Sequence, residues 1–101
     1  GFKENQKKIT VDEIINKCAE YFGTTSDLIK GSQRTGEIKS ARQAAIYLAR
    51  EILDLSFPAI AQSFNKNHTT ILYSYEKLKK DAELNVSLKE SLEKIEELIR
   101  N

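Results

Sequence analysis

The chain has 101 residues, with 16 Lys and Arg against 15 Asp and Glu, for a net charge of +1. Its length predicts one domain, and the near-neutral total, taken alone, argues against a nucleic-acid-binding protein. One Cys and one His provide neither an internal disulfide nor a set of metal ligands. No apolar run approaches membrane-spanning length and no signal peptide is visible. We therefore expect a fragment of a cytoplasmic protein.

The distribution of charge changes this picture. Residues 30–80 contain nine Lys and Arg and four Asp and Glu, whereas residues 81–101 contain three and six. The middle of the chain is thus a basic block that precedes an acidic C-terminal segment.

The first part of the chain begins with a polar stretch, residues 1–8, which we interpret as the remnant of a linker before a domain at 9–101. Thr10, with Glu13 three residues on, predicts a helix start, and Gly23 predicts its end. Its apolar face contains Val11, Ile14, Ile15, Cys18 and Phe22. A one-turn helix is predicted over 25–29.

The loop 31–37 contains Arg34 and precedes a long helix over about 38–54. The residues predicted to face inward are Ile38, Ala41, Ala45, Leu48, Ile52 and Leu55. A neighbouring stripe consists of Lys39, Gln43, Ile46 and Arg50, with Arg42 beside it.

A short helix, a tight turn and a second helix follow. Ser56 and Pro58 suit the start of the first helix, whose core face is Ile60, Ala61 and Phe64. Residues 65–67 form the turn, and Asn67 caps the next helix. There Ile71, Leu72, Tyr75 and Leu78 are predicted to point inward, leaving His68, Thr69, Ser74 and Lys77 outside, with Thr70 beside them. This pattern predicts a helix-turn-helix, which places the start of its second helix in the DNA major groove.

The last predicted helix, about 86–100, has Leu88, Leu92, Ile95 and either Leu98 or Ile99 as its apolar stripe. Its charged outer face is typical of a solvated packing helix, although docking on another domain is an alternative. The predicted fold is all-α, a compact bundle of about six helices with a Trp-repressor-like helix-turn-helix. Since no acid, base and nucleophile set is present, no enzyme activity is predicted.

Several residues have the chemistry of DNA contacts. His68, Thr69 and Thr70 offer hydrogen bonds and methyl groups to base edges, although helix capping alone would also explain Asn67, His68 and Thr69. Arg34, in its Gly-flanked loop, suits a narrow minor groove, or is simply a loop arginine. The residues that suit phosphate contacts are Lys39, Arg42, Gln43, Arg50, Lys66 and Lys77; a solvated basic face is the alternative. Phe57 and Pro58 form either an apolar edge for thymine methyls or a hydrophobic staple.

Three segments in order resemble the C-terminal DNA-binding domain (domain IV) of the DnaA family of bacterial replication initiators. They are Lys39-Ser40-Ala41-Arg42-Gln43, Tyr47-Leu48-Ala49-Arg50-Glu51, and Ser56 with Ile60 and Phe64 followed by His68-Thr69-Thr70-Ile71. The resemblance covers about residues 9–99.

The resemblance implies binding to DnaA boxes of the TTATCCACA type in duplex DNA at the replication origin. It implies minor-groove entry by Arg34, base contacts by Pro58, Asn67, His68 and Thr69, and backbone contacts by Arg42, Gln43, Arg50, Phe57 and Thr70. It implies no cofactor for this fragment, which we expect to be monomeric, and no membrane contact. ATP binding and self-assembly on DNA belong to the parent initiator.

The chain departs from the family at three places. Asn67 stands where an acidic residue is usual, and Ser40 stands where a basic residue is common. The loop around Arg34 has few other basic residues. Because Asn donates as well as accepts, base preference at that position loosens. A helix-turn-helix transcriptional regulator and a protein-interaction module are the alternative functions.

Overall fold

The computed structural model describes residues 8–101, and all regular structure in that range is helical. The helices are α1 (Val11–Phe22), α2 (Ser26–Lys30), α3 (Gly36–Leu53), α4 (Phe57–Phe64), α5 (His68–Leu84) and α6 (Val86–Arg100). The prediction of an all-α fold with about six helices is confirmed. Apart from Lys8, the predicted linker remnant at 1–8 lies outside the described residues.

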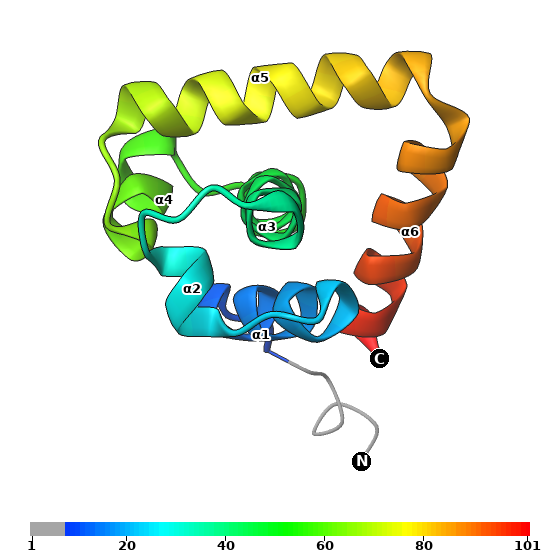
Figure 1. The fold of residues 1–101 in the computed structure, drawn as a ribbon, viewed down its shortest axis with the longest axis horizontal. Helices are drawn as coiled ribbons and strands as arrows, with labels where there is room; N and C mark the ends of the chain where they lie inside the picture. The colour runs from blue at the N-terminus through cyan, green and yellow to red at the C-terminus, as the bar shows by residue number, and fades with distance from the viewer. Residues whose placement is uncertain (1–7) are drawn as a thin grey trace.

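The central element is α3, which Figure 1 views almost end-on, with α1, α4, α5 and α6 arranged around it. It contacts α1, α2, α4, α5 and α6. Four of its buried residues are small: Ala41, Ala44, Ala45 and Ala49. These side chains let neighbouring helices approach closely, and the larger Ile46 and Leu48 fill the space between them.

Side-chain caps set the starts of several helices. Thr10, Thr25, Ser56, Asn67 and Asn85 each accept a hydrogen bond from the backbone N–H three residues on, at 2.9–3.3 Å. Such caps satisfy N–H groups that have no partner within the helix. Because capping is local chemistry, these boundaries follow closely from the sequence.

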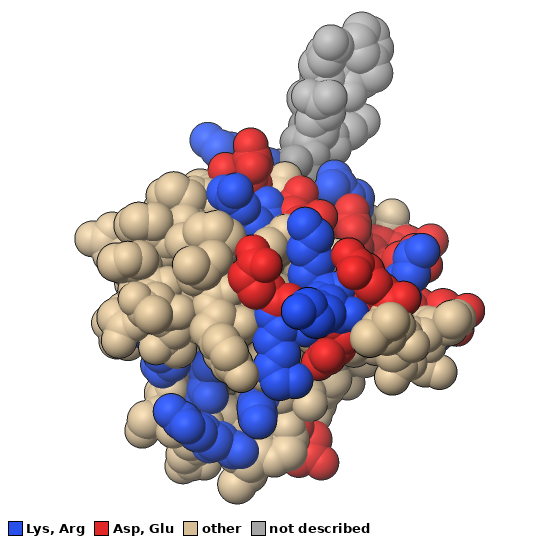
Figure 2. All heavy atoms as spheres, turned by 90° about the horizontal axis from the view of Figure 1, so that it is seen from above, with Lys and Arg blue, Asp and Glu red and all other residues tan. Residues whose placement is uncertain are grey.

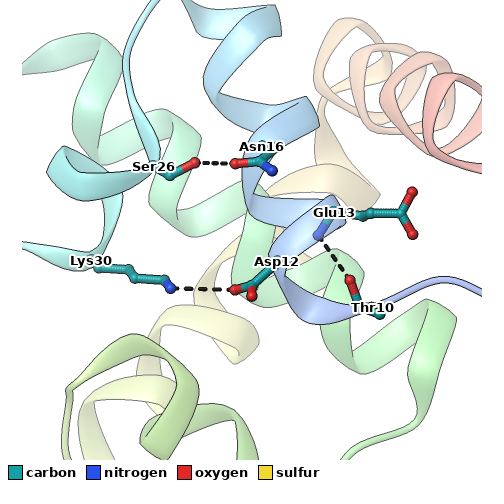
Figure 3. Close-up of polar contacts among 6 residues, drawn as sticks. All are labelled: Thr10, Asp12, Glu13, Asn16, Ser26 and Lys30. Carbon is teal, nitrogen blue, oxygen red and sulfur yellow. Dashed lines mark hydrogen bonds and ion pairs between the residues drawn. The ribbon is translucent and has the colours of Figure 1, made fainter.

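Polar contacts join α2 to α1 (Figure 3). Ser26 Oγ donates to Asn16 Oδ1, and Lys30 Nζ lies 3.3 Å from Asp12 Oδ1. Exposed ion pairs contribute little stability, so the fully buried Ile29 is the main anchor of α2. The loop that carries Arg34 therefore begins at a helix that is anchored to the core.

The inward-facing predictions for α3 and α5 need two corrections. Ile46, predicted on the stripe beside the inward face of α3 and not on that face, is only 1% exposed, because helices surround α3 on more than one side. Leu72, predicted to point inward, is 39% exposed, because α5 buries a single stripe. That stripe is Ile71, Tyr75, Leu78 and Ala82. In addition, α3 begins two residues earlier than predicted and ends one residue earlier.

The last helix packs against the same core as the others. Leu92, Ile95 and Ile99 are buried against it, and α6 contacts α1, α3 and α5. Of the two residues left open by the sequence, Ile99 faces inward and Leu98 is exposed. This packing fits a helix that covers the core of its own domain.

Candidate nucleic-acid interface

The predicted helix-turn-helix is formed by α4, residues 65–67 and α5. Asn65 adopts a left-handed conformation (φ 58°) that ends α4, and the N–H of Lys66 donates to the Ala61 carbonyl at 3.0 Å. Asn67 Oδ1 then accepts from the Thr70 N–H at 2.9 Å and begins α5. Since Phe64 and Ile71 are fully buried on either side, the turn is held against the core.

The first turn of α5 is turned outward. His68, Thr69 and Thr70 are all exposed, and the buried stripe of the helix starts only at Ile71. The capping role of Asn67 is confirmed, but it accounts for Asn67 alone. The side chains of His68 and Thr69 remain available at a helix start, which is where a helix-turn-helix meets base edges.

A groove of about 500 Å³ runs beside this turn, between the loop after α2, the start of α3 and the first half of α5. It brings together eight of the residues predicted to contact DNA, whereas Pro58, His68, Thr69, Arg50 and Phe57 are not part of its lining. Its lining is Ser32, Arg34, Lys39, Arg42, Gln43, Asn65, Lys66, Asn67, Thr70, Tyr73, Ser74 and Lys77. All the charged side chains in this lining are Lys or Arg.

Figure 2 looks onto the α5 side of the molecule. Asp and Glu gather mainly on the right, toward α6, whereas the Lys and Arg at the lower left have few acidic neighbours. On this face, one group of Lys and Arg therefore lies apart from most of the acidic side chains.

Arg42 lies at the base of the groove and is only 8% exposed. Its Nε donates to the Ile29 carbonyl at 2.6 Å, Nη1 to Gln33 at 2.7 Å, and Nη2 to Leu28 at 2.9 Å and Gly31 at 3.0 Å. These bonds use four of the five N–H groups of a guanidinium. The alternative of a solvated basic face is therefore wrong for Arg42, and its phosphate contact stays a prediction.

Lys66 joins the turn to the same loop, because its Nζ donates to the Gly31 carbonyl. Burial lowers the pKa of Lys66, and the charges of Arg42 and Arg34 lower it further. Burial likewise lowers the pKa of Arg42, with a further contribution from Arg34. Three cations thus raise one another's electrostatic energy, and an anion placed among them would relieve this repulsion.

Arg50, Phe57 and Pro58 lie apart from the groove lining. Arg50 Nη1 donates to the Leu55 carbonyl at 2.7 Å, and its guanidinium carbon lies 4.6 Å from the centre of the Phe57 ring. The Phe57 ring in turn packs on Tyr75 at 5.4 Å. Arg50 and Phe57 therefore brace the connection between α3 and α4, while Pro58 is exposed in the first turn of α4.

Comparison with known proteins shows similarity to a protein family and to curated relatives. The family described as the bacterial dnaA protein helix-turn-helix matches residues 11–78. The chromosomal replication initiator protein DnaA of Caldanaerobacter subterraneus subsp. tengcongensis is 35% identical over 94 residues, which cover 93% of this chain and 21% of that protein.

This chain belongs to the bacterial DnaA helix-turn-helix family. It spans about a fifth of the length of the curated relative that it matches. The matched residues 11–78 include the whole groove lining and end before α6. A helix-turn-helix is a motif of DNA binding rather than of catalysis.

Two further findings concern residues 8–101. That part of the chain contains no cluster of three or more His, Cys, Asp or Glu side chains able to hold a metal ion. None of its helices combines the length and apolar character needed to cross a membrane.

The DnaA-type groove also includes residues that the sequence did not indicate as contacts. Tyr73 is 69% exposed and lines the groove, as do Ser74, Asn65 and Ser32. Tyr73 and Ser74 follow Thr70 by three and four residues, which places them on the same side of α5. That spacing was the available signal, because Lys77 continues the same stripe.

Proposed function

We propose that this domain binds duplex DNA sequence-specifically, at boxes of the TTATCCACA type, and so serves replication initiation and its regulation. One observation carries the proposal. A single groove joins cations from a loop, from α3 and from α5, directly beside the exposed first turn of the second helix of a helix-turn-helix.

Two parts of this surface suit two different DNA grooves. His68 and Thr69 would read base edges in the major groove, with Asn67 beside them and Pro58 close to a thymine methyl. The exposed Arg34, which lines the groove, would enter the minor groove at an A·T-rich step, where the potential is most negative. The groove itself would accept the sugar-phosphate backbone.

Contacts to the backbone would come mainly from the groove lining. Lys39, Gln43, Lys66, Thr70 and Lys77 all face it, and such contacts add affinity without sequence information. For Arg42, Arg50 and Phe57 we propose chiefly a supporting role, since carbonyl oxygens and ring packing already engage them. Their direct contact with phosphate stays a prediction.

The activities of a whole initiator would lie outside this chain. We propose that ATP binding and self-assembly on DNA belong to other parts of the parent protein, and that this domain directs the parent protein to its binding sites on DNA. The domain alone would bind one box as a monomer.

A fluorescence-anisotropy titration tests the proposal. The domain is titrated into a labelled duplex containing one box and into a scrambled duplex of the same composition, at several salt concentrations. We expect roughly 1000-fold preference for the box, and a scrambled-site affinity that falls steeply with salt. Equal affinity for both duplexes at moderate salt would refute sequence-specific binding. If the box duplex is preferred, selection from random duplexes would identify the preferred box sequence.

A further inference from the structure

Arg42 and Lys66, which come from two different segments of the groove lining, donate to the same short piece of backbone. Arg42 comes from α3 and Lys66 from the helix-turn-helix turn, and both donate to the carbonyl oxygen of Gly31. Arg42 also binds the Gln33 carbonyl, next to Arg34. The loop that carries Arg34 is thus tied to α3 and to the turn before α5 at one point.

We propose that Arg42 is a positioning residue that, together with Lys66, fixes the Arg34 loop relative to the first turn of α5. This inference rests on the proposed DNA binding, in which the two must engage one duplex at the same time. Preorganisation of this kind raises affinity, because a loop that is already ordered in the free domain loses less conformational entropy when DNA binds.

The chemistry of Arg42 fits this role better than that of a phosphate clamp. A guanidinium holds several N–H groups in a rigid planar fork, which suits four carbonyl oxygens spread over residues 28–33. An ammonium has the same charge but cannot span this set. Lys is therefore a substitution that keeps the charge and removes the geometry.

Gly31 provides a way to disturb the same junction without changing any charge. A Cβ at this position would lie 3.3 Å from the Asp27 carbonyl oxygen and 3.5 Å from that of Leu28. The Leu28 carbonyl is one of the acceptors of Arg42. Gly31→Ala should therefore shift the junction slightly and weaken box binding in the same direction as Arg42→Lys.

A double-mutant cycle on DNA binding tests the role of Arg42. Arg42→Lys is expected to weaken box binding roughly tenfold and to leave the salt dependence unchanged. In an Arg34→Ala background the same substitution should have less than about a twofold effect, since it acts through Arg34. Additive losses, or equal losses on box and scrambled duplexes with a salt slope lower by about 0.9, would make Arg42 a phosphate contact and overturn the proposal.

Amide hydrogen exchange of the free domain tests the junction without DNA. Arg42→Lys and Lys66→Met should speed exchange at residues 31–35, while thermal unfolding shows that the domain is still folded. Lys39→Met is the matched control, because it removes an exposed groove cation by the same substitution and should leave this exchange unchanged.

Unchanged loop exchange in Arg42→Lys overturns the proposal, even if the wild-type domain does not discriminate boxes. A wild type that fails to discriminate refutes the proposed function alone.

Discussion

The groove and α6 both carry many charged side chains, but the two regions organise them differently. On α6, opposite charges lie one turn apart, and Arg100 pairs with Glu96 at 2.9 Å. In the groove, Lys77 has a similar pair with Asp81 at 3.0 Å, but Arg34, Arg42 and Lys66 come from three separate segments. The charge of Arg34 lowers the pKa of Arg42, and the charges of Arg42 and Arg34 lower the pKa of Lys66. Neutralised charge keeps a surface solvated, whereas unneutralised charge of one sign attracts a polyanion. Net charge alone therefore reveals little, and its placement decides the function.

Charge reversal should separate the two regions most strongly. Lys39→Glu with Lys77→Glu in the groove replaces two attractions to phosphate by two repulsions, so we expect a loss of roughly 100-fold or more in DNA affinity at low salt. The matched change on α6, Lys89→Glu with Lys94→Glu, should alter affinity by less than about threefold. Titrations of both variants would measure this, and similar losses would show that DNA does not use the groove.

The fold was largely predictable because its signals are local. Thr10, Ser56 and Asn67 each predict a helix start from a segment of four residues. The exposure of His68 and Thr69 follows from the cap at Asn67 and from the spacing of the apolar residues in α5. Arg42 was not predictable in the same way, because its partners are carbonyl oxygens 9–14 residues away. Ile46 was misplaced for a similar reason, since a pattern along one helix does not show how many neighbours surround it.

Removal of the loop guanidinium is the next largest expected effect. Arg34→Ala should weaken box binding by about 1–3 kcal/mol, the range of one good specific contact. Arg34→Lys keeps the charge and should recover only part of this loss, because a guanidinium suits a narrow minor groove better. Box and scrambled titrations decide between these outcomes. If both variants bind the box as tightly as the wild type, Arg34 is outside the interface.

His68 should affect preference more than affinity. His68→Ala is expected to reduce the box-to-scrambled ratio by about tenfold and to leave scrambled-site binding nearly unchanged, because a base contact carries sequence information and a phosphate contact does not. The groove variant Lys39→Met should behave in the opposite way and weaken both duplexes alike. A uniform loss for His68→Ala would make His68 a backbone contact.

Asn67 has two functions that substitution can separate. Asn67→Ala removes the cap of α5 and should lower the free energy of unfolding by about 1 kcal/mol. Asn67→Asp keeps an accepting oxygen at the cap, so we expect stability close to that of the wild type. Because a carboxylate only accepts, Asn67→Asp should also sharpen preference for a cytosine amino group. Thermal denaturation measures the effect on stability, and selection from random duplexes measures the effect on base preference. A change in preference spread over all positions of the box, and not at one position, would contradict the second expectation.

The smallest expected effect is a pH dependence that arises in the groove and not on α6. Burial and two neighbouring cations lower the pKa of Lys66 in the free domain, and bound phosphate would raise that pKa again. Well below the lowered value both states are charged, so affinity is constant. As pH rises through it, the free domain loses its proton first and binding must recover it, so affinity falls. We expect a few-fold decline that begins below the ordinary lysine pKa of 10.5, removed by Lys66→Met and retained in Lys39→Met. Parallel pH profiles for all three proteins would mean that Lys66 does not face phosphate in the complex.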